Sequence, residues 1–220
     1  GVGLEGISQS TYFLHNVNAF NEGAMPREMV PLKPGEKVAV IGGGNVAMDA
    51  ARTAIRLGAD VSVLYRRTQA EMPAIESEFS EAVKEGIKFR WQTQAKEFLG
   101  NGGNRLKAIR LETPDGETIE PFDRVFLAIG SRPASRIVST TEGIDIDEKG
   151  YVIVKDRPYG MTTRPGVFAG GDVVHRPQTV VMAMKAAKMV AQGIAEYVDA
   201  ERLMRDLGLL RDTDENKKAE

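Results

Sequence analysis

Three consecutive glycines stand between a short apolar segment and a segment with helical spacing. The loop consists of Gly42, Gly43, Gly44, Asn45, Val46 and Ala47 and reads G-x-G-x-x-A. In this pattern Gly42 permits a tight turn, Gly44 lets a diphosphate approach the backbone, and the small Ala47 allows close helix packing. Free amides at the start of a helix, together with the helix dipole, favour negative charge. The loop therefore predicts a binding site for the diphosphate of a dinucleotide.

The elements around this loop provide the context that the pattern needs. Residues 37–41 are a β-branched run typical of a buried strand, residues 46–57 have helical spacing, and residues 61–65 form a second strand. Gly58 is suited to end the helix. A strand, a helix and a strand in about 30 residues make one right-handed βαβ unit. The alternative is a glycine turn that only packs helix on strand, for which one glycine would suffice.

Two arginines follow the second strand, where the choice of nucleotide is made. An NAD site usually places a carboxylate there to bind the ribose 2′-hydroxyl, but the sequence reads LYRRTQ. The guanidinium groups of Arg66 and Arg67 suit a 2′-phosphate, because they form forked, charge-assisted hydrogen bonds. The sequence therefore favours NADP(H) over NAD(H), with Arg66 slightly preferred as the phosphate ligand. The alternative is an ordinary solvated loop.

The remaining pattern predicts an α/β protein in which a Rossmann-like parallel sheet is joined by a β-meander. A helix is expected within residues 8–22, before a proline-rich linker. Another is expected within residues 71–86, with Pro73 in its first turn and Gly86 at its end. Further strands are expected at residues 87–92, 95–99, 106–112, 117–120 and 123–130, the middle three as an antiparallel meander.

The carboxy-terminal third is predicted to contain short strands, a second glycine turn and a long helix. Residues 143–147 and 151–155 flank the turn DEKG as short strands, and residues 166–172 form a strand that runs into a second glycine turn. A long helix is expected over residues 178–198. The charged tail follows, and its last ten residues are expected to be disordered.

Composition excludes several kinds of site. The 220 residues contain no cysteine, so disulfide and dithiol chemistry are excluded within this chain. The two histidines, His15 and His175, have no acidic cluster at ligand spacing, and we expect no metal site. A net charge of −2 favours neither nucleic acid nor an anionic membrane, and no apolar run is long enough to span a bilayer. A cytoplasmic protein is expected.

The second glycine turn carries a resemblance to a known family. The stretch TTRPGVFAGGDVVHRPQTVVMAMKAAK resembles the flavin motif T-x-x-x-x-[VF]-F-A-x-G-D of the two-dinucleotide flavoprotein oxidoreductases. GLEGI, VIGGGNVAMDAARTA, LYRRTQAEMPA and FLAIGSRP support it in the family's order. Within this superfamily the chain is most similar to the small subunit of NADPH-dependent glutamate synthase. A half of dihydropyrimidine dehydrogenase and the ferredoxin–NADP transhydrogenase subunit look similar too.

The resemblance implies a fold in which an NADP(H)-binding domain is inserted into an FAD-binding domain. Residues 1–33 would be a linker and helix of the FAD domain, residues 34–130 the NADP(H) domain, residues 131–200 carboxy-terminal FAD-domain segments, and residues 201–220 the tail. The cofactor-binding residues that it adds are Gly130, Gly171, Asp172, Thr179 and Val180. Asp172 would bind ribityl hydroxyls, although it could instead cap its turn, and the helix start near Thr179 would stabilise reduced flavin.

The implied function is electron input. Hydride would pass from NADPH to FAD, and electrons would then leave to iron–sulfur centres, on a glutamate synthase large subunit or another acceptor. This step is mainly positioning, so we name no catalytic side chain. We expect the chain to be a fragment without the first FAD loop, inactive alone, poor at holding FAD and open to self-association. The alternatives are a non-redox NAD(P) module, a transhydrogenase- or dihydropyrimidine dehydrogenase-like input subunit, and a monooxygenase-like flavoenzyme.

Overall fold

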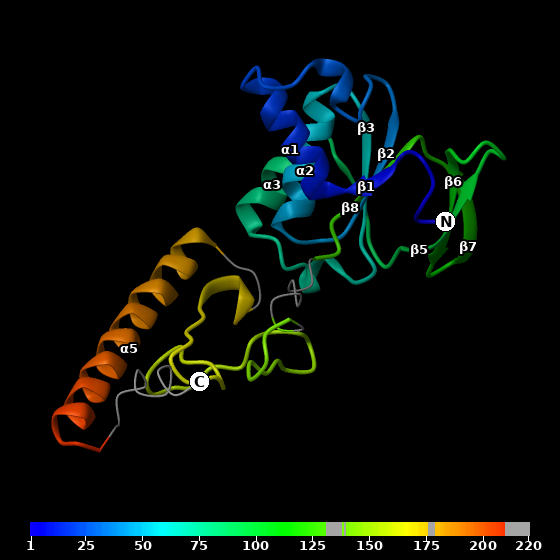
Figure 1. The fold of residues 1–220 in the computed structure, drawn as a ribbon. Coiled ribbons are helices and arrows are strands. Elements are labelled where there is room, and N and C mark those ends of the chain that lie inside the picture. The colour runs from blue at the N-terminus through cyan, green and yellow to red at the C-terminus, as the bar shows by residue number, and fades with distance from the viewer. Residues whose placement is uncertain (131–137, 139, 176–178, 210–220) are drawn as a thin grey trace. The chain divides into compact units, whose positions relative to one another are not determined.

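The computed structural model describes residues 1–130, 138, 140–175 and 179–209. The chain divides into two compact units, residues 1–130 and residues 131–220. The first unit contains a parallel sheet, helices that cover it and a smaller antiparallel sheet (Figure 1). The second unit contains isolated bridges and one long helix.

The larger sheet has five parallel strands in the order β1-β8-β2-β3-β4. These strands are β1 (Ile7–Gln9), β2 (Lys37–Ile41), β3 (Asp60–Leu64), β4 (Lys88–Arg90) and β8 (Arg124–Leu127). The helices α1 (Ser10–Asn21), α2 (Asn45–Arg56) and α3 (Glu76–Lys84) lie on one side of it (Figure 1). The predicted α/β class, the βαβ unit and the return of residues 123–130 to the parallel sheet are confirmed.

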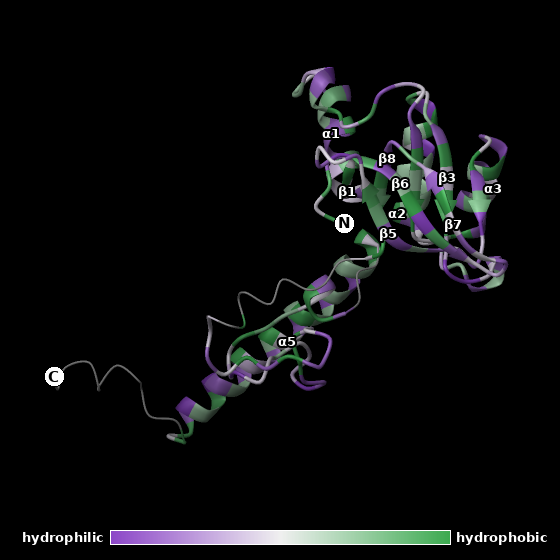
Figure 2. Cartoon of the chain, turned by 90° about the vertical axis from the view of Figure 1, so that its right-hand side faces the viewer, coloured by the Kyte–Doolittle hydropathy of each residue, from purple (hydrophilic) through white to green (hydrophobic). Residues whose placement is uncertain are grey.

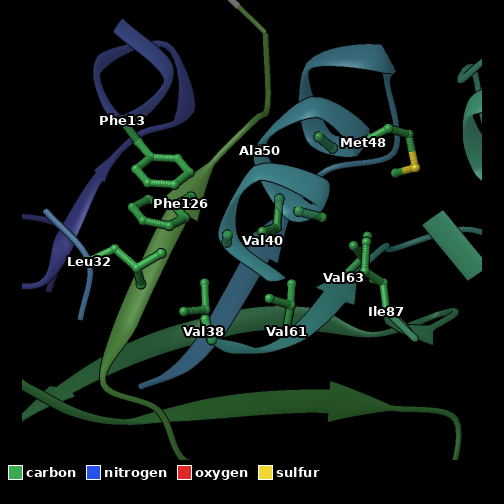
Figure 3. Packing of buried hydrophobic residues seen from close by; sticks show 14 of the residues in the cluster. Phe13, Leu32, Val38, Val40, Met48, Ala50, Val61, Val63, Ile87 and Phe126 are labelled. Carbon is green, nitrogen blue, oxygen red and sulfur yellow. The ribbon is translucent and has the colours of Figure 1, made fainter. Parts of the chain in front are cut away.

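The core between the helices and the sheet follows from the alternation of side chains along β2. Val38 and Val40 point to the helices and are fully buried there, as Figure 3 shows. Phe13 of α1 stacks on Phe126 of β8 with 4.1 Å between ring centroids. Because both faces of a parallel sheet are covered, its strands read as continuous apolar runs.

The opposite face of the sheet is covered by the β-meander. Its strands are β5 (Gln94–Gly100), β6 (Leu106–Thr113) and β7 (Gly116–Pro121), paired in antiparallel order. Ala39 of β2 and Val125 of β8 point to this side and pack with Ile109 and Leu111 of β6. The predicted meander is confirmed at all three strands.

The first thirty residues lie closer to the nucleotide domain than the sequence suggested. We separated residues 1–33 from the Rossmann-like domain, yet β1 is an edge strand of the same sheet and α1 packs on α2. The sequence reading missed β1 because three residues are too short for a strand signal. Residues 1–130 form one unit, and the assignment of its parts to FAD and NADP(H) domains stays a prediction.

Helix α3 begins later than the sequence indicated. The prediction placed Pro73 in the first helical turn, but the helix starts at Glu76 after the cap residue Ile75. The preceding residues form a separate 3₁₀ turn, Gln69–Glu71, closed by a capping box between Thr68 and Glu71. Pro73 therefore lies between two elements, and the prediction was wrong there. Gly86 does follow the helix end, with a φ of +89°.

The strands predicted in the second unit are reduced to single bridges. Ile146 pairs with Val152, Val154 with Thr162 and Met161 with Phe168, each as one isolated bridge. The amide of Val152 donates to the carbonyl of Val173, and that of Lys155 donates to the carbonyl of Met161. Among the described residues of this unit, no ladder extends beyond one bridge.

Helix α5 (Val180–Asp206) is longer than predicted and carries an exposed apolar stripe. It runs past residue 198 into the predicted tail, where Glu201 accepts a hydrogen bond from Tyr197 and pairs with Arg205 one turn later. Apolar and polar residues mix along it in Figure 2. The exposed stripe consists of Val180, Met184, Ala187, Ala191, Ile194 and Val198. Residues 211–220, expected to be disordered, lie outside the described residues.

Candidate functional site

The predicted site lies where three neighbouring parallel strands end. Ile41 of β2 pairs with Leu64 of β3 on one side and with Leu127 of β8 on the other. Three loops therefore leave the same edge of the sheet, residues 42–44, 65–75 and 128–130. In open α/β sheets, ligands bind at this carboxyl edge.

Two of the three glycines are required by the protein itself. Gly42 has a φ of +140°, and a Cβ there would collide with the carbonyl oxygen of Ala128. Its amide donates to the carbonyl of Leu64 at 3.1 Å. A Cβ on Gly43 would lie 2.7 Å from the ring of Tyr65. These two glycines therefore allow the loops after β2, β3 and β8 to pack closely.

Gly44 differs, because no protein atom lies within 4 Å of the position its Cβ would take. Its backbone, at φ −92° and ψ 177°, is an ordinary extended conformation that does not need glycine. The missing side chain therefore leaves open space directly at the start of α2. Ala47 is fully buried, as expected for the position that brings helix and strand together.

The amides around Gly44 are available to a ligand. No acceptor among the described residues bonds to the amides of Gly43, Gly44, Asn45 or Val46, whereas those of Ala47 and Met48 bond to the carbonyl of Gly44. Unsatisfied amides at a helix start carry partial positive charge. The arrangement fits the diphosphate of a dinucleotide, since open space and free donors coincide.

The arginines of the next loop are exposed. Arg66 and Arg67 follow Tyr65 directly after β3, and neither forms an ion pair with any described residue. Most other arginines of the first unit do pair with carboxylates, as Arg52, Arg90 and Arg124 do. Uncommitted guanidinium groups at the end of the second strand suit an anionic ligand.

The loop that carries these arginines is tied to the glycine loop. The amide of Ala74 donates to the carbonyl of Gly43 at 3.0 Å, and the amide of Ile75 donates to Oδ1 of Asn45 at 2.9 Å. The side chain of Asn45 therefore connects two loops, and the backbone amide of Asn45 remains available to a ligand. No local pattern signals this contact, because it joins residues 30 positions apart.

A capping box stabilises the middle of the same loop. The carboxylate of Glu71 accepts from the amide of Thr68 at 3.1 Å and from its hydroxyl at 2.9 Å. These bonds, with a smaller effect of Arg67, hold the pKa of Glu71 below its ordinary value. The sequence reading missed this box, although Thr-x-x-Glu in TQAE is its recognised signature.

The remaining predicted residues of the first unit line the same edge. Val46 stands in the first turn of α2 with 42% of its surface exposed. Gly130 ends the loop after β8 with a φ of +91° and open space at its Cβ position. The first unit thus brings the predicted residues from Gly42 to Ala47 to one sheet edge with Arg66, Arg67 and Gly130.

The second unit brings together the residues that the resemblance assigned to flavin. Gly171 and Asp172 lie in a 3₁₀ turn, Gly171–Val173, and a Cβ on Gly171 would touch Ala183 of α5 at 3.9 Å. Thr179 caps α5, and its hydroxyl accepts from the amide of Met182. Val180 is 77% exposed in the first turn. An exposed carboxylate beside a helix start is compatible with a flavin chain, and its role stays a prediction.

Among the described residues, no helix has both the length and the apolar character to cross a membrane. The same residues contain no group of three histidine, aspartate or glutamate side chains that could hold a metal ion.

Comparison with known proteins places this geometry in a family. The model of the pyridine nucleotide-disulphide oxidoreductases matches residues 2–187. The glutamate synthase [NADPH] small chain of Halomonas elongata is 34% identical, over 90% of this chain and 46% of that protein. The NADP(+)-dependent formate dehydrogenase subunit beta of Moorella thermoacetica is 33% identical, over 89% of this chain and 29% of that protein.

The fold has solved counterparts. Thioredoxin reductase of Lactococcus lactis superposes with a TM-score of 0.70 and 25% identity, over 89% of this chain and 59% of that chain. The chain spans about half the length, or less, of the curated relatives named here. The resemblance predicted from the glycine motifs is confirmed, since the chain belongs to the pyridine nucleotide-disulphide oxidoreductase family.

Proposed function

We propose that this chain is the NADP(H)-binding portion of a flavin-dependent oxidoreductase of the glutamate synthase small-chain type. One observation carries the proposal: Gly44 lies beside amides that bond to no described acceptor at the start of α2, and the loop bonded to the same turn carries two arginines without an ion pair among the described residues. A diphosphate and a 2′-phosphate are the two anionic groups of NADPH, and their chemistry suits these two places.

The residues of the chain act by binding and orientation. The amides of Gly44, Asn45 and Val46 would hold the diphosphate, and Arg66 and Arg67 the 2′-phosphate. In the second unit, Asp172 would accept hydrogen bonds from ribityl hydroxyls, and the first turn of α5 would face the flavin. When both cofactors are bound, they supply hydride transfer from C4 of the nicotinamide to N5 of the flavin.

The proposed role includes a partner that takes the electrons. The names of the relatives, a small chain and a beta subunit, support a protein that works in an assembly. We propose an iron–sulfur acceptor on a partner subunit, such as a glutamate synthase large subunit, and a cytoplasmic location. FAD would be the first acceptor, as the family resemblance implies.

Coenzyme binding tests this proposal directly. Isothermal titration of the 220-residue chain with NADPH and with NADH should give a lower Kd for NADPH by at least about tenfold, because charged hydrogen bonds contribute about 1.5–3 kcal/mol. The double variant Arg66→Ala/Arg67→Ala should lose this preference and keep its NADH affinity. Arg202→Ala is the matched control and should bind both coenzymes as the wild type does, because Arg202 of α5 is exposed and forms no ion pair with any described residue.

Two results would contradict the proposal. The first is a wild-type chain that binds neither coenzyme, which would remove the diphosphate site. The second is equal affinity for NADPH and NADH, which would mean that the two arginines belong to an ordinary surface loop and bind no 2′-phosphate.

A further inference from the structure

One face of α2 carries polar residues along the whole helix. They are spaced four, three and four positions apart, so they lie above one another on the helix surface. The residues of this face are Asn45, Asp49, Arg52 and Arg56. Helix α3 lies beside α2 (Figure 1), and three of the four side chains bond to the segment from Ile75 to Glu85. We call this face of α2 the polar seam.

Arg52 of the polar seam joins both ends of α3. Its Nη1 donates to Oε2 of Glu78, in the first turn, at 2.6 Å. Its Nε and Nη2 donate to Oε1 of Glu85, the residue that follows the helix, at 3.1 and 2.9 Å. The Arg52 side chain is only 18% exposed, so these charged hydrogen bonds are partly shielded from water. Because the guanidinium is planar and its donors point in fixed directions, the three bonds define the position of α3 along α2.

The other contacts of α3 constrain this position less. Phe79 meets Phe89 of β4 edge to face, with 4.8 Å between ring centroids. Apolar contacts are not directional and tolerate small shifts of the helix. The carboxylate of Glu85 depends on the polar seam, since its Oε2 is buried without a hydrogen bond and its Oε1 accepts from Arg52 and Arg56. The directional bonds of α3 therefore come chiefly from these two arginines.

We infer that Arg52 is a positioning residue for the coenzyme site: it holds α3 against α2, keeps the arginine loop, residues 65–75, beside the glycine turn, and thereby sustains the preference for NADPH over NADH. This inference rests on the proposed NADP(H) site. The path from Arg52 to the loop is short, because Glu78 stands three residues after Ile75. The amide of Ile75 is itself bonded to Asn45 beside the glycine turn.

The charges of the polar seam explain why the loss of Arg52 should move the loop. Glu78 and Glu85 share this cation, and Asp49 places a third carboxylate on the same face of α2. Burial and the nearby charge of Glu78 raise the pKa of Asp49, whereas Arg52 lowers it. Without the guanidinium, the carboxylates repel one another. The start of α3 would then shift away from α2, together with the loop that precedes it.

The experiment measures the Kd of NADPH and of NADH by titration calorimetry in the wild type and in three variants. Arg52→Gln removes the cation but keeps a long side chain that favours helix. It should raise the Kd for NADPH by about three- to tenfold and that for NADH by less than about twofold. Glu78→Gln weakens only the bond at the start of α3 and should raise the Kd for NADPH by about two- to fivefold.

Arg56→Gln is the matched control. Arg56 bonds to Glu85 at the end of α3 but not to Glu78, and its side chain is 62% exposed. This variant should therefore keep both Kd values within about twofold of the wild type. Urea unfolding of each variant separates a loss of stability from a loss of coenzyme preference. A residue that only stabilises the fold would change both affinities alike or neither.

The outcomes separate this inference from the proposed function. A wild-type chain without a preference for NADPH overturns both. A wild-type preference that persists unchanged in Arg52→Gln overturns only the inference. An equal loss of affinity for the two coenzymes in Arg52→Gln does the same, as does an equal loss of preference in Arg56→Gln. If Arg52→Gln does not fold, Glu78→Gln decides, because the Glu78 side chain is 38% exposed and tolerates the change, and an unaltered preference there overturns the inference.

Discussion

The substitution Gly44→Ala separates coenzyme binding from folding. The new methyl group would enter open space, since no protein atom lies within 4 Å of it. The backbone at Gly44 is extended, which alanine adopts freely. Alanine is a poorer cap residue than glycine by about 0.5–1 kcal/mol, but it lowers the entropy of the unfolded chain by about 0.4–1 kcal/mol. The free energy of unfolding should therefore change by less than about 0.5 kcal/mol.

The same methyl group would occupy the place that we assign to the diphosphate. A displaced phosphate loses at least one charged hydrogen bond to the amides beside Gly44, which costs about 1.5–3 kcal/mol. The Kd should rise by about 10- to 150-fold. Because the diphosphate is common to both coenzymes, NADPH and NADH should lose affinity by the same factor. Calorimetric titration gives the Kd values, and urea unfolding gives the stability.

Gly43→Ala is the matched control, one residue earlier in the same loop. Its methyl group would lie 2.7 Å from the ring of Tyr65, whose hydroxyl is held by the carbonyl of Glu71. Overpacking of this kind costs about 1–3 kcal/mol, so this variant should lose stability where Gly44→Ala does not. Wild-type affinity in Gly44→Ala would refute the assignment of the diphosphate to this turn. A loss for NADPH alone would refute it as well.

Two further predictions concern the loops and helices that support the site. Asn45→Ala removes the acceptor for the amide of Ile75 and should weaken NADPH binding about two- to tenfold more than NADH binding. Asn45→Asp keeps this acceptor but adds a negative charge beside the diphosphate, so it should weaken the binding of both coenzymes equally. Equal effects of both variants, measured by titration, would argue against the contact. Hydrogen bonds from Arg56 and Arg52 hold the pKa of Glu85 below its ordinary value. The contribution of Glu85 to stability is therefore complete above the pKa of an unfolded glutamate, about 4.3, and is lost as the pH falls through the lower pKa of the folded state. Glu85→Gln should reduce stability by about 1 kcal/mol at pH 7 and weaken the decline below about pH 4, as urea unfolding at both pH values would test.

Local signals were sufficient to predict most of the first unit. The strand at Lys37–Ile41, the glycine loop and the helix that ends before Gly58 depend on neighbouring residues, and each was predicted close to its place. Edge strand β1 was missed, because three residues give no periodicity and gain their role only from pairing with β8. The second unit was predicted less well, since its segments meet in single bridges that sequence periodicity does not encode.

The glycine run shows what the structure adds to a sequence motif. The motif assigned Gly42 to the turn and Gly44 to the diphosphate but gave Gly43 no role of its own, and the structure shows that the first two glycines are needed for close contacts with Ala128 and Tyr65. Those contacts come from the loops after β8 and β3, which lie far away in the sequence. The arrangement of the strands adds that, of these three glycines, Gly44 is the one that faces open space.

The contacts that join the two loops were predictable only where they are local in the sequence. The capping box of Thr68 and Glu71 is a local pattern and could have been predicted, whereas the bond from Ile75 to Asn45 depends on how the loops pack. This bond joins the arginine loop to the turn that we assign to the diphosphate. A defect in the turn should therefore lower both affinities, and a defect in the loop should lower that for NADPH alone. The ratio of the Kd for NADH to the Kd for NADPH therefore shows whether a variant has damaged the turn or the arginine loop.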